Sequence, residues 1–335
     1  MSFDMKRSLL LLVLLSVGFT SFSQERIQYR DTTRYYEFEV NYWFNLHHFL
    51  YMEAFLNVKM DSSLLKKELP SADGMILETS LAYYREKLVD QDLRMSDYMT
   101  AFKEWVTGEA FEPQQVPEQF KEHFEVLRVA GATYEKHFWN DHFSQAQSLL
   151  EENLPLIRAT EEPYVKEITK LTRQFWQPEG KVKVDVVFYA KSSTWNPRNR
   201  PYTSIFPTHV VMNVFGENHI KGNWVELLYH ESAHHLILGG SYFVGGTLRD
   251  LSEARGLKTP RQLWHAYLFF FTGEISRKLL KENGVDYAQT YMERNKVFSY
   301  YHPYLYKHLL PYINREVTLA EATENFIRDY QSEKD

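Results

Sequence analysis

The spacing of apolar residues divides the chain into a helical first half and a mixed second half. Apolar side chains recur every three or four residues over residues 41–57 and 75–176, with an interruption at Pro113 and Pro117. This period places them on one face of a helix, so we expect helices in both segments. A second break is expected at Pro163, because proline cannot donate the hydrogen bond of a helix interior.

The period changes after a turn at residues 177–181. Residues 182–190 and 208–214 are rich in valine and predict two strands, and the end of the segment 24–40 alternates like a third. Further helices are expected over residues 260–282, 286–299, 303–313 and 318–330. The pattern predicts a mainly α fold of the α+β class, with a small sheet beside the helix that carries the chemistry.

The N-terminal residues have a pattern of their own. Lys6 and Arg7 precede an apolar run over residues 8–20, and small residues follow it. This order is typical of a secretory signal peptide, and the run is short for a spanning helix. We expect cleavage of residues 1–23, export to the periplasm or exterior of a Gram-negative bacterium, and no membrane span afterwards. The alternative is an uncleaved membrane anchor.

Composition limits the chemistry. The 335 residues include no cysteine, so a metal site must use histidine, aspartate, glutamate and water. The net charge is −6 and no stretch is strongly basic, which gives no sign of a nucleic-acid partner. The length allows two regions, and we expect a helical region at 24–178 and the functional region at 179–335.

The segment "LLYHESAHHLIL", residues 227–238, combines histidines with an apolar pattern that predicts a helix, with Asn223 as its N-cap. On a helix, His230 and His234 lie one turn apart on the same face and can bind one Zn²⁺. Glu231 can then accept a proton from a water activated by the ion. The alternative is a core helix whose histidines bond to backbone carbonyls.

The motif from His230 to His234, after the strand "THVVMN", resembles that of the zincin metallopeptidases. The resemblance covers about residues 182–282. It implies one zinc ion, a peptide substrate, and a preceding strand that pairs with that substrate. The metzincin branch would need a glycine at position 237 and a histidine at position 240, where this chain has Ile237 and Gly240. The gluzincin branch remains, in which a glutamate of a later helix completes the site.

Glu274 is the expected third ligand. It lies in a mostly apolar helix, where a carboxylate is costly to bury unless a metal or another group pairs with it. Gly273 beside it would allow a close approach to the motif helix. The alternatives are an ion pair of Glu274 with Arg277 or Lys278, and ligation by His265. His265 lies nine residues earlier, on the opposite face of the same helix.

Several other polar residues near the motif are expected to have structural or supporting roles. Glu253, a third choice of ligand, lies in a polar, loop-like segment and is expected to pair with Arg249 or Arg255. His235 points away from the ligand pair and is expected to have a structural role. Glu226 is expected to be a surface glutamate, or to accept the second N–H of a ligating histidine. The candidates for stabilising an oxyanion are Tyr242, Tyr300, Tyr301 and His302.

The sequence therefore predicts an exported zinc-dependent hydrolase, most simply a peptidase acting on a peptide or protein. One Zn²⁺ is held by His230, His234 and Glu274, with His265 as the alternative third ligand, and Glu231 is the general base. Two other classes stay open. One is a metal-binding protein without catalysis, and the other is a helical envelope binding protein that carries the motif by accident.

Overall fold

The computed structural model describes residues 27–65, 69–176, 180–191, 200–205, 207–216, 221–237 and 242–332. The expected signal peptide, residues 1–23, lies outside the described residues. Within these ranges, no helix combines the length and the apolar character that crossing a bilayer requires.

Five strands form one mixed sheet with the order β1-β2-β3-β5-β4. They are β1 (Ile27–Thr32), β2 (Tyr36–Asn41), β3 (Val182–Val187), β4 (Tyr202–Ile205) and β5 (Thr208–Asn213). The three central strands are parallel, and β1 and β4 each run antiparallel to their neighbour. The strands β2, β3 and β5 were predicted. In contrast, β1 and β4 lie in segments without a clear alternating pattern.

The sheet joins the two regions expected from the sequence. Tyr36 of β2 is paired with Val182 of β3, and the register continues to Glu39 and Asp185. The expected boundary between residues 178 and 179 therefore passes through one sheet, and side chains from both regions share one core. The predicted fold class, mainly α with a small sheet, is confirmed.

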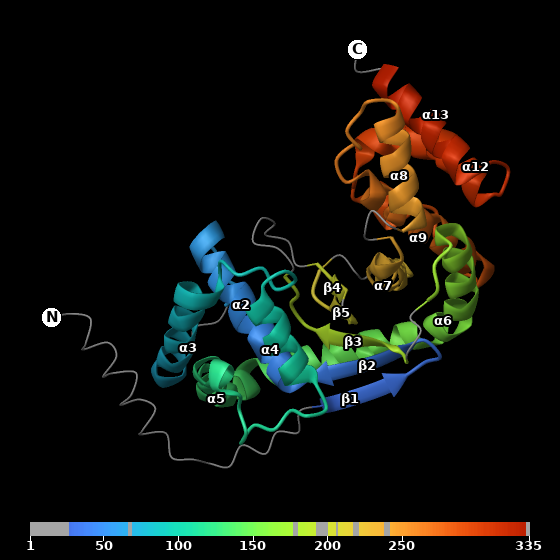
Figure 1. Ribbon diagram of the computed structural model, residues 1–335. Helices are drawn as coiled ribbons and strands as arrows, with labels where there is room; N and C mark the ends of the chain where they lie inside the picture. Colours follow the sequence, from blue (N-terminus) through green and yellow to red (C-terminus); the bar gives the residue numbers. More distant parts are fainter. Residues whose placement is uncertain are drawn as a thin grey trace.

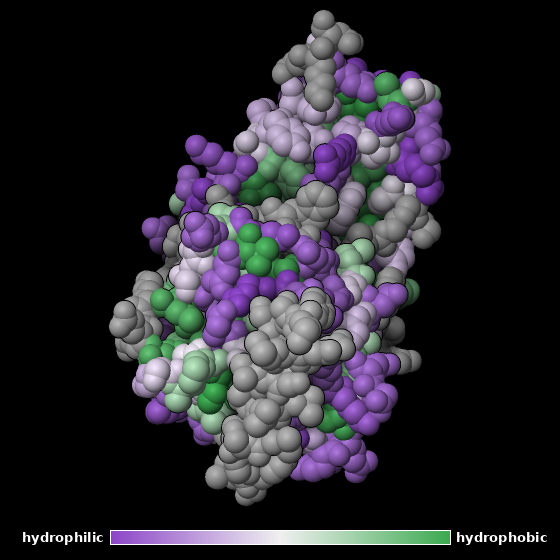
Figure 2. All heavy atoms as spheres, turned by 90° about the vertical axis from the view of Figure 1, so that its left-hand side faces the viewer, coloured by the Kyte–Doolittle hydropathy of each residue, from purple (hydrophilic) through white to green (hydrophobic). Residues whose placement is uncertain are grey.

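Five long helices lie in the described part of the first half. They are α2 (Tyr42–Met60), α3 (Ser71–Tyr83), α4 (Asp97–Thr107), α5 (Lys121–Tyr134) and α6 (Asn140–Thr172). Figure 1 shows α2 to α5 gathered at one end of the sheet, while α6 runs on toward the C-terminal helices. Figure 2 views the end formed by α2 to α5, where small apolar patches are separated by hydrophilic residues.

Proline affects these helices in two ways. Pro113 and Pro117 lie between α4 and α5, as predicted. The break expected at Pro163 is wrong, because Pro155 and Pro163 both lie inside α6. Neither proline is buried, so water can reach the carbonyls that lose a helical partner, and the buried face of α6 packs against α7 and α9.

The second half contains α7 (Asn223–Ser232), α8 (Phe243–Ala254), α9 (Leu263–Glu282), α10 (Tyr291–Arg294), α11 (His302–Tyr304), α12 (Leu310–Ile313) and α13 (Leu319–Ser332). The predicted helices at 260–282 and 318–330 are α9 and α13. The segment 286–299 forms only the short α10, followed by turns. In Figure 1, α7 lies between the sheet and the group formed by α8, α9, α12 and α13.

Candidate metal centre

The helix α7 begins one residue earlier than predicted. Its cap is Gly222, with φ 87°, and Asn223 is the first helical residue. A Cβ atom at Gly222 would lie 2.9 Å from Leu280 Cδ1 and 3.1 Å from Tyr287 Cδ2. Both the positive φ and the lack of space require glycine here. The indole of Trp224 then donates to the Asn213 carbonyl at 3.2 Å, which attaches the start of α7 to the end of β5.

The motif helix ends earlier than expected. α7 stops at Ser232, and His234 begins a 3₁₀ turn. The carbonyl of Tyr229 accepts hydrogen bonds from the Tyr164 hydroxyl at 2.8 Å and from the Ala233 N–H at 3.1 Å. Such donors satisfy the carbonyls that a helix end leaves without partners. His230 and Glu231 are therefore held on the last turn of α7, and His234 follows on a tighter turn.

Three histidines converge at this turn. The Nε2 atom of His230 lies 3.2 Å from the Nε2 atom of His234 and 3.2 Å from that of His265. One ring nitrogen from each of the three lies within 4.8 Å of the other two. His265 comes from the first turn of α9, which packs against α7. The structure thus brings the alternative third ligand to the motif.

The two separations of 3.2 Å from His230 Nε2 match those between ligands of a tetrahedral zinc site. Zn–N bonds of about 2.0–2.1 Å at tetrahedral angles place two ligand nitrogens about 3.3 Å apart. Burial, followed by the mutual influence of the rings, lowers the pKa of His230 and His234 well below the usual value. Burial lowers the pKa of His265 to about 4. All three rings are therefore neutral near pH 7, the form that binds a metal.

Side chains of α9 orient the His230 ring. Phe269 stacks on it with ring centroids 3.6 Å apart. The Thr272 hydroxyl lies 3.5 Å from His230 Nδ1 and donates its own proton to the Leu268 carbonyl at 2.9 Å. Its oxygen is then the acceptor for the Nδ1 proton, and this assignment of the tautomer leaves Nε2 with its lone pair toward the other histidines.

The carboxylate of Glu231 lies beside the three histidines. Its Oε2 atom lies 3.7 Å from His234 Nε2. Burial raises the pKa of Glu231 to about 8, and the positive charge of Arg94, a residue of the first half, acts in the opposite direction. The Arg94 charge also lowers the pKa of His234 and His265. A buried glutamate with a pKa near the ambient pH is suited to accept and return a proton.

Glu274 lies on the opposite side of α9 from His265, as the nine-residue spacing requires. Its carboxylate forms an ion pair with Arg277 and accepts a hydrogen bond from the Tyr306 hydroxyl at 3.1 Å. The cost of burying this carboxylate is thus offset by protein groups. Of the possibilities left open by the sequence, the structure shows the pair with Arg277.

Glu226 is not the surface residue that we expected, because its exposed fraction is 1%. Its carboxylate accepts hydrogen bonds from the Tyr287 hydroxyl at 2.5 Å and from the Tyr291 N–H at 3.0 Å. A Cβ atom on Gly273 would lie 3.2 Å from Glu226 Oε1 and 3.1 Å from Thr290 Cβ. Gly273 therefore does allow a close approach of α9 to α7, as predicted, and Glu226 joins α7 to α10.

Glu253 and His235, the lesser ligand candidates, have other surroundings. Glu253 is exposed on α8, in a segment expected to be a loop, and Arg255 pairs with Glu324 instead. His235 has the expected structural role, since its Nδ1 donates to the Ser232 carbonyl at 2.8 Å.

Two of the proposed oxyanion-stabilising residues are bonded to the backbone. The hydroxyl of Tyr301 donates to the Arg261 carbonyl at 3.2 Å, and His302 Nε2 donates to the Val297 carbonyl at 2.9 Å. The side chain of Tyr300 is 55% exposed.

The expected substrate-pairing strand is also corrected. The strand β5, residues 208–213, lies between β3 and β4, so both of its edges are already paired. The strand β4 is at the end of the sheet order and contacts both α7 and the 3₁₀ turn of His234. Among the described strands, β4 is therefore the one with an unpaired edge beside the histidines.

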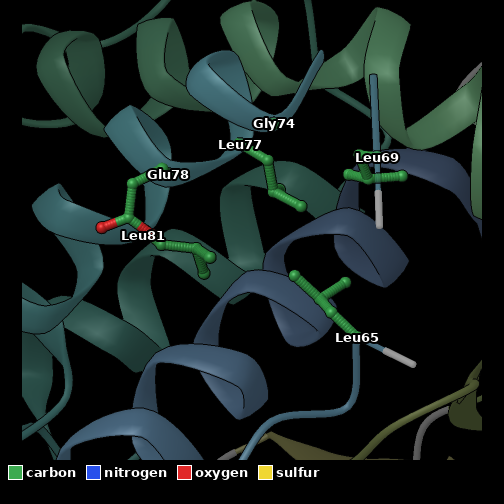
Figure 3. A pocket seen from close by; sticks show the side chains of 6 residues that line it. All are labelled: Leu65, Leu69, Gly74, Leu77, Glu78 and Leu81. Atoms are coloured by element: carbon green, nitrogen blue, oxygen red, sulfur yellow. The ribbon is translucent and has the colours of Figure 1, made fainter. Parts of the chain in front are cut away.

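A separate small hollow lies in the first half. Its cavity volume is about 140 Å³, and its lining consists of Leu65, Leu69, Gly74, Leu77, Glu78 and Leu81. Figure 3 shows the leucine side chains converging from α3 and from the segment after α2. This lining offers one carboxylate and otherwise carbon, so it adds no chemistry to the metal centre.

Comparison of the chain with models of protein families, with curated proteins and with solved structures finds no match.

Proposed function

We propose that this protein is a zinc-dependent hydrolase in which His230, His234 and His265 hold one Zn²⁺. The observation that carries the proposal is the separation of 3.2 Å between the Nε2 atoms of His230 and each of the other two histidines. This separation is close to the edge of a zinc coordination tetrahedron. When bound, the ion would polarise a substrate carbonyl and lower the pKa of a water molecule.

Glu231 is the proposed general base and acid. Its carboxylate accepts a proton from the attacking water, and the carboxylic acid then gives this proton to the leaving nitrogen of the cleaved amide. Its position 3.7 Å from His234 Nε2 puts it beside the ligand set without making it a ligand. Burial raises its pKa above the usual value, which strengthens it as the acceptor of the proton from water.

Among the described strands, β4 has an unpaired edge beside the histidines, and this edge supports a peptide as substrate. An extended peptide can add to an unpaired strand edge through backbone hydrogen bonds, whatever its side chains. The strand β4 contacts the 3₁₀ turn of His234, so a peptide paired with it would pass close to the three histidines. We therefore propose a peptidase rather than a hydrolase of small molecules.

The proposed ligand set differs from the resemblance that suggested it. A gluzincin would use two histidines and a glutamate, whereas here all three ligands are neutral imidazoles. Three neutral ligands leave the full double positive charge on the ion, which strengthens its pull on a carbonyl oxygen. The motif at 230–234 supports the hydrolytic chemistry, but the third ligand argues for a site of a different type.

The test is metal analysis of the purified full-length protein, followed by substitution with Co²⁺. We expect one zinc per chain and, with cobalt, the intense visible absorption of a tetrahedral site, lost in His265→Ala. Peptide hydrolysis is then compared between the wild type and Glu231→Gln. Stoichiometric zinc with equal activity in both proteins would favour the non-catalytic metal-binding class. Absence of zinc would favour the helical binding protein.

A further inference from the structure

We infer that the metal centre carries a subsite for an aromatic or large aliphatic side chain of the substrate, formed by Trp264, Phe298 and Tyr300. We call these three residues the aromatic wall. The inference rests on the proposed hydrolytic function, and it names the class of substrate.

The aromatic wall adjoins the ligand histidines directly. The ring of Trp264 stacks on His265 with centroids 4.9 Å apart and meets His234 edge-on at 6.0 Å. The ring of Phe298 meets His265 edge-on at 5.6 Å. Tyr300 continues the wall outward, because it meets Phe298 edge-on at 6.3 Å. A group bound on this wall would therefore lie next to the reacting carbonyl.

These rings are not simply part of the core. Trp264 and Phe298 are only partly buried, and Tyr300 is 55% exposed, whereas most of the described aromatic residues of α9 are buried. Partly exposed rings beside a metal centre offer apolar surface that gains from being covered. A substrate side chain of similar character is the group that would cover it.

The backbone holds Phe298 in this place under strain. Its φ of 51° and ψ of 36° are in the left-handed region, which side chains other than those of glycine and asparagine rarely adopt. The segment is fixed by the Tyr301 hydroxyl, which donates to the carbonyl of Arg261, two residues before α9. Strained residues concentrate at functional sites, and here the strain sets a ring against a proposed ligand.

The experiment compares two hexapeptides that differ only in having phenylalanine or alanine next to the cleaved bond. Binding is measured by titration calorimetry on zinc-loaded Glu231→Gln protein, which is expected to bind without turnover. We expect the phenylalanine peptide to bind about tenfold more tightly. In the Phe298→Asn background the ratio should fall below about threefold.

Asparagine tolerates the left-handed conformation, so Phe298→Asn removes the ring without removing the backbone geometry. The matched control is Met75→Ala, an exposed apolar residue of α3 in the first half, which should leave the ratio unchanged. Equal binding of the two peptides, or an unchanged ratio in Phe298→Asn, would overturn the subsite. Failure of the proposed function would look different, with no zinc and no cleavage of either peptide by the wild type.

Discussion

The Nε2 atoms of His230 and His265 lie 3.2 Å apart, although one belongs to the last turn of α7 and the other to the first turn of α9. Each neutral imidazole offers one ring nitrogen with a lone pair, and three such nitrogens close to one point can bind a metal ion. We therefore expect His265→Ala to lower zinc affinity by more than about 100-fold, the upper end of what loss of a supporting bond costs. Competition with a chromophoric chelator measures it.

The matched control is Glu274→Gln on the same helix. Its carboxylate is bonded to Arg277 and Tyr306, so the variant should keep zinc affinity within about twofold of the wild type. A larger loss of zinc in Glu274→Gln than in His265→Ala would restore Glu274 as the third ligand and contradict our assignment.

The role of Glu231 gives a second prediction. Glu231→Gln keeps the shape of the side chain but cannot take up a proton, so hydrolysis should fall by about 10²- to 10⁴-fold. Zinc content should stay at one per chain, since Glu231 is not among the three converging histidines. The readout is kcat/KM for a fluorogenic peptide together with metal analysis. Glu253→Gln, an exposed change on α8, serves as the control, and equal losses in both variants would speak against a base at position 231.

The sequence was sufficient to bring together two of the three converging histidines. The spacing of His230 and His234 placed them together because it depends only on local helical geometry. The third ligand could not be chosen in this way. Helical periodicity showed that His265 and Glu274 lie on opposite faces of one helix, but not which face meets α7. The burial argument favoured Glu274, but Arg277 and Tyr306 already compensate its buried carboxylate, so burial gives no reason to expect a metal there.

The sheet, too, could be predicted only in part from the sequence. The valine-rich strands β3 and β5 were predicted from composition, because central parallel strands are buried on both faces. The edge strands β1 and β4 were missed, because they are short or partly exposed and lack a clear alternating pattern. The pairing of β2 with β3 joins segments far apart in the chain, so the division at residue 178 was not a structural boundary.

The close approach at Gly273 leads to a third prediction, about stability. Alanine favours a helix over glycine by about 1 kcal/mol, but a Cβ atom here would lie 3.1 Å from Thr290 and 3.2 Å from Glu226 Oε1. Neither neighbour can yield easily, because Thr290 caps α10 and Glu226 is held by Tyr287. We expect Gly273→Ala to lower the free energy of unfolding by about 1–2 kcal/mol, measured by urea denaturation.

Gly74 of α3 is the matched control for this substitution. The nearest atoms to its added Cβ would be 3.9 Å away, so the helix preference acts there without a clash. Gly74→Ala should raise stability by up to about 1 kcal/mol. If both variants changed stability in the same direction, the close approach of α9 to Glu226 and Thr290 would not be the reason for glycine at position 273.

Buried histidines away from the metal centre give the last prediction, on pH. Burial lowers the pKa of His47 to about 3 and that of His142 to about 3, against about 6.5 in an unfolded chain. Between pH 6.5 and 3 the unfolded state therefore binds more protons than the folded state. Stability is full above pH 6.5 and falls as the pH is lowered through this window, by about 1.4 kcal/mol per pH unit for each such histidine.

His142→Phe isolates one of these contributions. The ring of His142 stacks on Phe188 with centroids 3.9 Å apart, and phenylalanine preserves this packing, although the Tyr134 hydroxyl loses its bond to Nδ1. The variant should be less stable at pH 7.5, yet the loss of stability on going to pH 5 should be smaller by about 1–2 kcal/mol. Urea denaturation at both pH values, with a chelator present so that metal binding does not contribute, measures the difference. Parallel pH dependence in the two proteins would show that folding does not lower the pKa of His142.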